Sequence, residues 1–167
     1  MRIAAWILGP IVGIILLIVV IGWSLPVDHH VSREASFHVP SESLFAVISS
    51  PADFPRWKTG VKRVELLPDE LGHARFREVS SNGAILYEID RAIPNTQWVT
   101  RIADKSLPFG GTWTYDLTPN RDGTTLRITE DGEVYNPVFR FVSRYVMGQT
   151  ATMDQYLADA QRRFASR

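Results

Sequence analysis

The chain has 167 residues, enough for one ordinary domain and a short additional segment but too few for two full domains. Its 18 Lys and Arg residues balance 18 Asp and Glu residues, so the sequence lacks the clustered basic charge of a nucleic-acid-binding protein. The sequence contains no Cys, which excludes disulfides, Cys-ligated zinc, iron–sulfur clusters and thiol catalysis.

The N-terminal segment is apolar and carries no charged side chain from Ile3 to Trp23. About 20 residues with a rise of about 1.5 Å each match a hydrocarbon core of about 30 Å, so residues 3–24 are predicted to form a transmembrane helix. Trp6 and Trp23 lie near the two ends of this run, where indole rings favour the membrane interface. The sequence therefore predicts a single-pass membrane anchor.

Two other interpretations of this segment stay open. A buried core helix seldom has so long a run without a polar face. A cleaved signal peptide would end near Gly22-Trp23-Ser24, which loosely imitates a cleavage site, but the run exceeds the usual hydrophobic region of about 7–15 residues. Arg2 and the free amino terminus precede the run, whereas Asp28 and Arg33 follow it, so the positive-inside rule favours an extracytoplasmic domain.

The chain after the anchor begins with a short linker, residues 25–30, and then a strand. From Val31 to Val39 apolar and polar side chains alternate, with Arg33 as the exception, as in a half-buried strand. Pro40 ends this strand, and Ser41 is predicted to cap a short helix. The stretch 51–57 suits a second short helix or a tight turn.

The following sixty or so residues are predicted to form antiparallel strands separated by turns. Asn82-Gly83 favours the type I′ turn of a hairpin, and residues 120–123 form another hairpin turn. Together with the first strand this makes about seven strands, the later six being 61–67, 74–79, 85–91, 97–103, 112–118 and 124–135.

A long helix is predicted to close the chain. Asn136-Pro137 is a strong helix start, because Asn accepts from free N–H groups and Pro at the first helical position loses no hydrogen bond. Gly148 can bend this helix midway. Its apolar residues recur at spacings of three and four and form one stripe, which includes Phe141, Tyr145, Met153, Tyr156, Leu157, Ala160 and Phe164.

This order of elements resembles the α+β helix-grip fold of Bet v 1-like and START-related proteins. Residues 109–115, with Gly110-Gly111 followed by Trp113, resemble the Gly-Gly-x-Trp segment of the polyketide cyclase/dehydrase branch of the SRPBCC superfamily. Residues 49–57 and Asn136-Pro137 are also similar to segments of that branch. The resemblance covers about residues 31–165 and assigns residues 31–167 to one domain, a curved antiparallel sheet wrapped on a long C-terminal helix.

The resemblance implies a cavity between sheet and helix that accepts a hydrophobic molecule. Aromatic residues on the faces assigned inward by alternation supply suitable walls, and two further rings are positioned to close one mouth. For any one of these rings, plain core filling is the alternative interpretation. The candidate ligand-binding residues are Phe54, Trp57, Phe76, Tyr87, Trp98, Trp113, Tyr115, Phe141 and Tyr145.

Catalytic chemistry has little support in the sequence. The four His residues have no metal-ligand spacing, and no nucleophile elbow or phosphate-binding loop occurs, so we predict no metal, no cofactor and no named catalytic residue. Glu78 is the exception worth weighing, since alternation places it on the same side as Phe76. An inward carboxylate has a raised pKa and can act as a general acid or base. Glu88 is expected to face water.

Three functions are compatible with these features. The preferred one is a non-enzymatic, membrane-anchored module that binds a lipid or another hydrophobic small molecule. The second is a cyclase-like or hydrolytic enzyme on the same scaffold, which an inward carboxylate with a polar partner would favour. The third is a structural or interaction protein with a filled core. No nucleic-acid partner is expected, and no protein partner is predicted.

Overall fold

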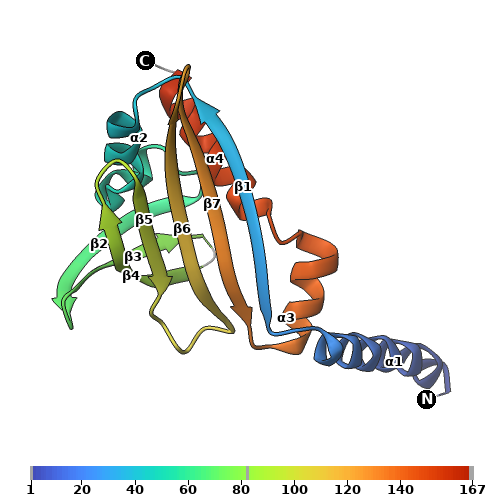
Figure 1. Cartoon of the computed structure of the whole chain (residues 1–167). Coiled ribbons are helices and arrows are strands. Elements are labelled where there is room, and N and C mark those ends of the chain that lie inside the picture. Colours follow the sequence, from blue (N-terminus) through green and yellow to red (C-terminus); the bar gives the residue numbers. More distant parts are fainter. Residues whose placement is uncertain (1, 82, 166–167) are drawn as a thin grey trace.

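The computed structural model describes residues 2–81 and 83–165, with side chains from residue 9 onward within these ranges (Figure 1). The first element, α1 (Arg2–Ser24), is a single helix that projects from one end of the domain. In the described part of the chain, no helix combines the length and the apolar character that crossing a bilayer requires. The expected helix at 3–24 is therefore present, whereas its role as a transmembrane span is not confirmed. The side chain of Trp6 lies outside the described residues.

Within the described residues, seven antiparallel strands form one sheet, as predicted, in the order β1-β7-β6-β5-β4-β3-β2. The first strand therefore pairs with the last, and every other strand pairs with its neighbour in sequence. The sheet is strongly curved, so that β2, β3 and β4 cross the direction of β6 and β7 (Figure 1). The strands are β1 (Asp28–Phe37), β2 (Val61–Glu70), β3 (His73–Ser80), β4 (Gly83–Ile93), β5 (Gln97–Ile102), β6 (Phe109–Asn120) and β7 (Gly123–Val134).

Two boundaries near the N-terminus differ from the expectation. β1 begins at Asp28, inside the predicted linker, because His29 pairs with Gly132 of β7 and extends the ladder. Ser41 is the first residue of its helix and not the cap, since Pro40 holds the cap position. The hairpin turn predicted at Asn82-Gly83 includes Asn82, which lies outside the described residues.

Two short helices, which follow β1 and precede β2 in the sequence, cover one end of the sheet. They are α2 (Ser41–Ile48) and a 3₁₀ helix, η1 (Pro51–Arg56). Leu44 and Ile48 of α2 are fully buried, and Phe54 of η1 is 2% exposed. Burying these apolar side chains, at about 1.5–3 kcal/mol each, holds the helical pair on the sheet.

The predicted long C-terminal helix is broken into three parts. They are α3 (Pro137–Val142), a π-helical turn η2 (Ser143–Met147) and α4 (Ala151–Ala165). Asn136 caps α3 as predicted, accepting from the Phe139 N–H at 3.1 Å. Gly148 has φ +79° and ψ 132°, a conformation that side-chain-bearing residues avoid, and it ends the helix instead of bending it.

The break separates the two halves of the segment in space. α4 packs on the sheet through Met153, Tyr156, Leu157 and Ala160, all of which are at most 6% exposed, whereas α3 meets the sheet at its end, where Phe139 stacks on Phe109 at 5.8 Å. α3 lies beside the end of α1 (Figure 1). The face of the sheet that α4 covers is called the inner face below (Figure 1).

Candidate functional site

The inner face carries an unbroken row of paired side chains across five strands. Cross-strand pairing joins each member of the row to the next, and alternate residues of a strand share one face. Trp113 at the centre of the row is half-buried and packs against the core. The row consists of Val31, Glu130, Trp113, Thr100 and Ile89.

On one side of this row, aromatic rings fill the space between the sheet and the helices. Trp98 lies 5.0 Å from Tyr115, and Tyr115 lies 5.3 Å from Tyr156 of α4, measured between ring centroids. Phe54 contacts Trp57 and Phe76 edge-on at 5.6 and 5.9 Å. These rings contact one another directly, so this part of the predicted cavity is core.

Five of the nine candidate ligand residues therefore lie in the core, with exposures between 1 and 9%. Two others are half-buried on the inner face and contact core rings: Tyr87 stacks on Phe76 at 5.2 Å, and Trp113 lies 6.2 Å from Tyr156. The five buried residues are Phe54, Trp57, Phe76, Trp98 and Tyr115.

The remaining two candidates do not meet the sheet as expected. Phe141 of α3 and Tyr145 of η2 contact each other with tilted rings whose centroids are 5.1 Å apart. Tyr145 is 59% exposed. The helix ends at Gly148, and Tyr156 of α4 makes the contacts with Tyr115 and Trp113 that were expected of these two rings.

Glu130 is an inner-face carboxylate that sequence reasoning missed. The indole N–H of Trp113 donates a hydrogen bond to it, and His29 Nε2 lies 3.6 Å from its Oε1. Burial raises the pKa of Glu130 above its ordinary value, and the contacts with Trp113 and His29 offset only part of this effect. The side chains of His29 and Glu130 are 16% and 20% exposed.

Gly132 makes room for this arrangement. A Cβ atom at Gly132 would overlap the imidazole of His29, so only glycine lets the ring lie over β7 beside Glu130. The alternation of β7 contains the signal for an inward Glu130, because Leu126 and Ile128 occupy the same face. No sequence pattern indicated that His29 lies beside Glu130, since the strand partner of His29 is about a hundred residues away in the sequence.

A second polar group lies deeper on the inner face. Glu78 faces inward, as alternation predicted, and its carboxylate binds Lys58 Nζ at 2.5 Å. Both side chains are mostly buried, at 13% and 17% exposure. Lys58 also lies over the ring of Phe54 at 4.5 Å. No sequence pattern indicated this ion pair, because Lys58 follows the short helix at a position with no periodicity.

Three phenols accompany the two carboxylates. Burial raises the pKa of Tyr87, and the nearby Glu78 and Glu130 carboxylates raise it further. Burial likewise raises the pKa of Tyr115 and of Tyr156. All three phenols are therefore neutral hydrogen-bonding groups near neutral pH. The hydroxyl of Tyr156 and the indole N–H of Trp57 are buried without a well-formed hydrogen bond to any described residue.

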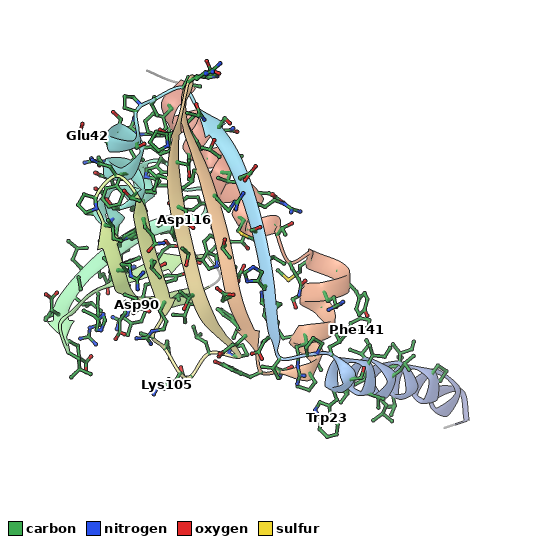
Figure 2. All side chains as sticks on the ribbon, in the orientation of Figure 1. Trp23, Glu42, Asp90, Lys105, Asp116 and Phe141 are labelled. Carbon is green, nitrogen blue, oxygen red and sulfur yellow. The ribbon has the colours of Figure 1, made fainter. Side chains whose placement is uncertain are left out.

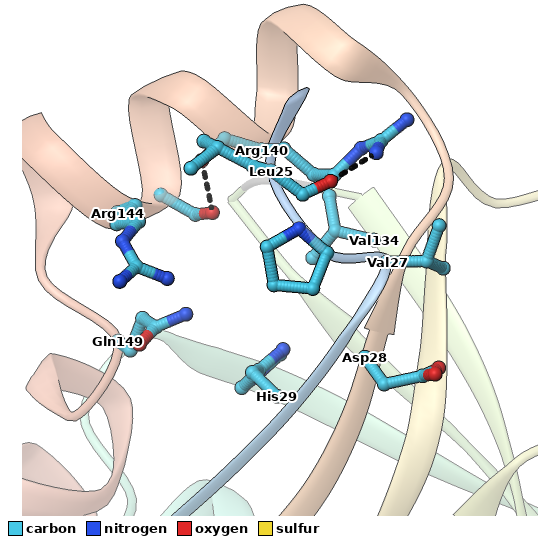
Figure 3. Close-up of a pocket in the computed structure, with 10 residues that line it drawn as sticks. Leu25, Val27, Asp28, His29, Val134, Arg140, Arg144 and Gln149 are labelled. Carbon is cyan, nitrogen blue, oxygen red and sulfur yellow. Dashed lines mark hydrogen bonds between the residues drawn. The ribbon is translucent and has the colours of Figure 1, made fainter. Parts of the chain in front are cut away.

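Two pockets lie at the end of the sheet near α1, and neither lies between α4 and the sheet. One is about 10 Å³, enough for one water molecule, and is lined by residues of β1 and by Arg140, Arg144 and Gln149 (Figure 3). The other is an open pocket of about 350 Å³ between the start of β1 and the end of β7. His29 lines both pockets, so it lies where the inner face meets the surface.

A curved sheet that grips a C-terminal helix, with polar groups set into an aromatic inner face, defines a START-related helix-grip protein. The chain belongs to the polyketide cyclase / dehydrase and lipid transport family, which it matches over residues 28–165. A comparison with curated protein sequences gives no match.

Solved structures show the same fold at low sequence identity. The di-domain ARO/CYC StfQ from the steffimycin biosynthetic pathway aligns with a TM-score of 0.66 and 15% identity, covering 84% of this chain and 52% of that one. The present chain thus spans about half of the di-domain protein. A START superfamily protein from Mycobacterium smegmatis aligns at 0.64 with 16% identity, covering 83% and 98% of the two chains. A Thalictrum norcoclaurine synthase aligns at 0.65 with 10% identity, covering 84% and 96%.

Proposed function

We propose that the protein is a membrane-tethered module that binds a hydrophobic small molecule with a neutral hydrogen-bond-donor head, such as a long-chain alcohol. The observation that carries this proposal is the helix break at Gly148. Because residues 137–147 meet the sheet near α1, where Phe139 stacks on Phe109, they do not continue α4 along the inner face, and Trp113, Tyr87 and Ile89 stay half-buried there. An apolar chain laid on these residues gains about 0.8 kcal/mol for each buried methylene group.

The polar groups of the inner face favour a particular head group. A carboxylate has about four acceptor positions, and at Glu130 the indole of Trp113 uses one of them. A ligand hydroxyl can donate to another. The burial that raises the pKa of Glu130 would equally penalise a ligand carboxylate, so a fatty acid should bind less well than the matching alcohol.

The proposed tether is α1. Its sequence has no charged side chain from Ile3 to Trp23, and the described apolar residues Leu16, Leu17 and Val20 are 58–62% exposed. A helix of 23 residues is about 34 Å long, which suits a hydrocarbon core of about 30 Å. With Arg2 before the run, this tether would set the domain on the extracytoplasmic side. Apolar cargo would then exchange with the bilayer without a long aqueous passage.

A cyclase-like enzyme is the second candidate, and the Glu78–Lys58 ion pair is the observation that favours it. A buried carboxylate beside a cation and near the phenols of Tyr87, Tyr115 and Tyr156 can move protons on a bound polar substrate. The binding function does not need this chemistry.

Photo-crosslinking of the full chain in lipid nanodiscs tests the proposal. The probe is a hexadecanol that carries a diazirine near the end of its chain, and modified peptides are identified by mass spectrometry. We expect saturable labelling of β4 and β6, in addition to α1, and competition by hexadecanol at about tenfold lower concentration than by palmitate. Labelling confined to α1 and α3 would contradict the proposal.

Two substitutions of exposed or half-buried aromatic residues serve as a matched pair. Trp113→Ala should reduce labelling of β4 and β6 at least about fivefold, which corresponds to about 1 kcal/mol. Tyr145→Ala removes a ring of similar size from η2 and should leave that labelling unchanged. Trp113→Ala also weakens packing, so Glu130→Leu is the second test. This variant keeps the Trp113 indole and should remove the preference for alcohol over acid.

A further inference from the structure

The segment Pro137–Met147, called the arm below, exposes an unusual run of large apolar side chains. Tyr145, Val146 and Met147 follow one another in η2 and are 59%, 71% and 59% exposed. Val138 of α3 is 41% exposed. Single exposed apolar residues are ordinary, whereas a contiguous group marks a surface that contacts something apolar.

The arm is fixed to the end of α1. Gly22 of α1 is buried against Pro137, and a Cβ atom at Gly22 would overlap the Pro137 carbonyl. Arg140 Nη1 donates to the Leu25 carbonyl oxygen at 2.7 Å (Figure 3). The arm therefore lies at the end of the domain from which α1 leaves (Figure 1). Trp23, 72% exposed, lies at this same junction (Figure 2).

A basic side chain accompanies the apolar run. Arg144 is exposed, and none of the ion pairs among the described residues involves it. Its guanidinium group lies near Gln149 and His29 at the small pocket (Figure 3). Arg beside exposed Tyr, Val and Met is the composition of a segment in the headgroup region of a bilayer, where the guanidinium group meets lipid phosphate.

We propose that the arm lies in the interface of the same bilayer that α1 enters, with η2 inserted and Arg144 bound to lipid phosphate. The proposal rests on the membrane tether proposed above. A bilayer is the occupant favoured over a second copy of the chain, because the exposed apolar surface of the arm continues through Trp23 onto the exposed side chains of α1. Docked in this way, the arm keeps the contact of Phe139 with Phe109 at the end of the sheet, while its exposed side chains enter the bilayer interface.

Acidic residues at the same end of the sheet reduce any preference of the arm for anionic lipid. Asp28, Asp131 and Glu133 line the open pocket there. They offset the attraction of Arg144 to a negatively charged membrane. The phosphate of a zwitterionic phospholipid is therefore sufficient for Arg144, and docking of the arm should not need anionic lipid.

The cysteine-free sequence allows a direct test with single-cysteine variants of the full chain in phosphatidylcholine nanodiscs. An environment-sensitive NBD label is placed at Val146 of the arm (V146C), at Leu16 of α1 (L16C) and at Leu71 (L71C). Leu71 is 95% exposed in the turn between β2 and β3, on the far side of the sheet from α1 (Figure 1). Quenching by nitroxide-bearing phospholipids reports contact with lipid and its depth.

We expect L16C to be quenched most by a deep nitroxide, V146C most by a shallow one, and L71C by neither. Quenching of L16C without quenching of V146C would overturn the arm proposal and leave the tether intact. Absence of quenching at L16C would overturn the tether and the arm together. A blue-shifted V146C label that lipid nitroxides fail to quench would show a protein contact, which also overturns the arm proposal.

Charge reversal tests the role of Arg144. In the V146C background, Arg144→Glu should reduce shallow quenching at least about twofold in phosphatidylcholine. Arg121→Glu is the matched control, because Arg121 is exposed in the hairpin turn between β6 and β7 at the opposite end of the sheet (Figure 1). Equal quenching in the two variants would rule out phosphate binding by Arg144.

Discussion

Asp159 of α4 is a buried carboxylate that joins this helix to the loop before β2. It is 2% exposed and accepts from the backbone N–H of Thr59 at 2.7 Å, from the Thr59 hydroxyl at 2.9 Å and from Gln155 Nε2 at 2.8 Å. Arg162 pairs with the same carboxylate. These contacts hold α4 in register against the sheet, although Asp159 takes no part in the proposed binding.

Asp159→Ala should lower the free energy of unfolding by about 3 kcal/mol, because it leaves the Thr59 N–H buried without an acceptor. Asp154→Ala on the same helix is the control. Its carboxylate pairs with Arg33 at a site where both side chains are about half exposed, so the loss should stay below about 1 kcal/mol. Urea denaturation followed by Trp fluorescence measures both values. Equal losses of unfolding free energy in the two variants would contradict the role assigned to Asp159.

The raised pKa of Glu130 predicts how the folding stability depends on pH. Because burial raises this pKa in the folded state, the folded protein binds the proton more tightly than the unfolded chain does. The Glu130 contribution therefore favours folding below the unfolded pKa of about 4.5 and is lost as pH rises through the folded value. Glu130→Gln removes this dependence and should gain stability relative to the parent chain between pH 4.5 and 7. A constant difference across this range would show that Glu130 is not buried as described.

At the scale of elements, two adjacent strands meet at a pair of glycines that have different roles. Gly111 has φ +124°, and a Cβ atom there would lie 2.7 Å from the Gly132 Cα and overlap the Asp131 carbonyl. These backbone atoms cannot shift to make room for a Cβ atom without a large cost in free energy. At Gly132 the obstacle is only the side chain of His29, which can rotate away.

Gly111→Ala should therefore cost about 2 kcal/mol or more in the free energy of unfolding, and Gly132→Ala less than about 1 kcal/mol. Gly132→Ala should also displace His29 from Glu130 and change the NMR signals of the His29 imidazole. Thermal or urea denaturation compares the two variants. A large loss of stability from Gly132→Ala would mean that strand backbone, and not the His29 imidazole, occupies the space beside Gly132.

Most elements could be predicted from local patterns. Alternation gave the seven strands and the inward direction of Glu78, Tyr87 and Trp113, and Asn136-Pro137 marked the start of α3. The break at Gly148 could not be predicted, because helical periodicity continues on both sides of it. The break places α3 against α1, a contact between segments more than a hundred residues apart that no local pattern indicates. The Glu130–His29 pair was missed because its members lie about a hundred residues apart, and the Glu78–Lys58 pair was missed because Lys58 lies outside any periodic pattern.

At the scale of the whole molecule, three features act together. The sheet and α4 form a filled aromatic core, which accounts for most of the rings assigned to a ligand. The C-terminal segment is divided, so that one half grips the sheet and the other half joins α1 (Figure 1). The inner face between these halves keeps Trp113 and Tyr87 half-buried beside two carboxylates. The proposed binding function depends on this half-buried part of the inner face accepting a ligand.

The five Trp residues make the most direct measurement possible, because their indole N–H groups give separate NMR signals. The full chain is labelled with ¹⁵N-Trp, held in deuterated nanodiscs and titrated with 1-decanol, and signals are assigned with single Trp→Phe variants. The account predicts a saturable shift of the Trp113 signal while Trp98, which is 1% exposed in the core, stays unchanged. A Trp113 signal that does not move while those of Trp6 and Trp23 in α1 respond would contradict it.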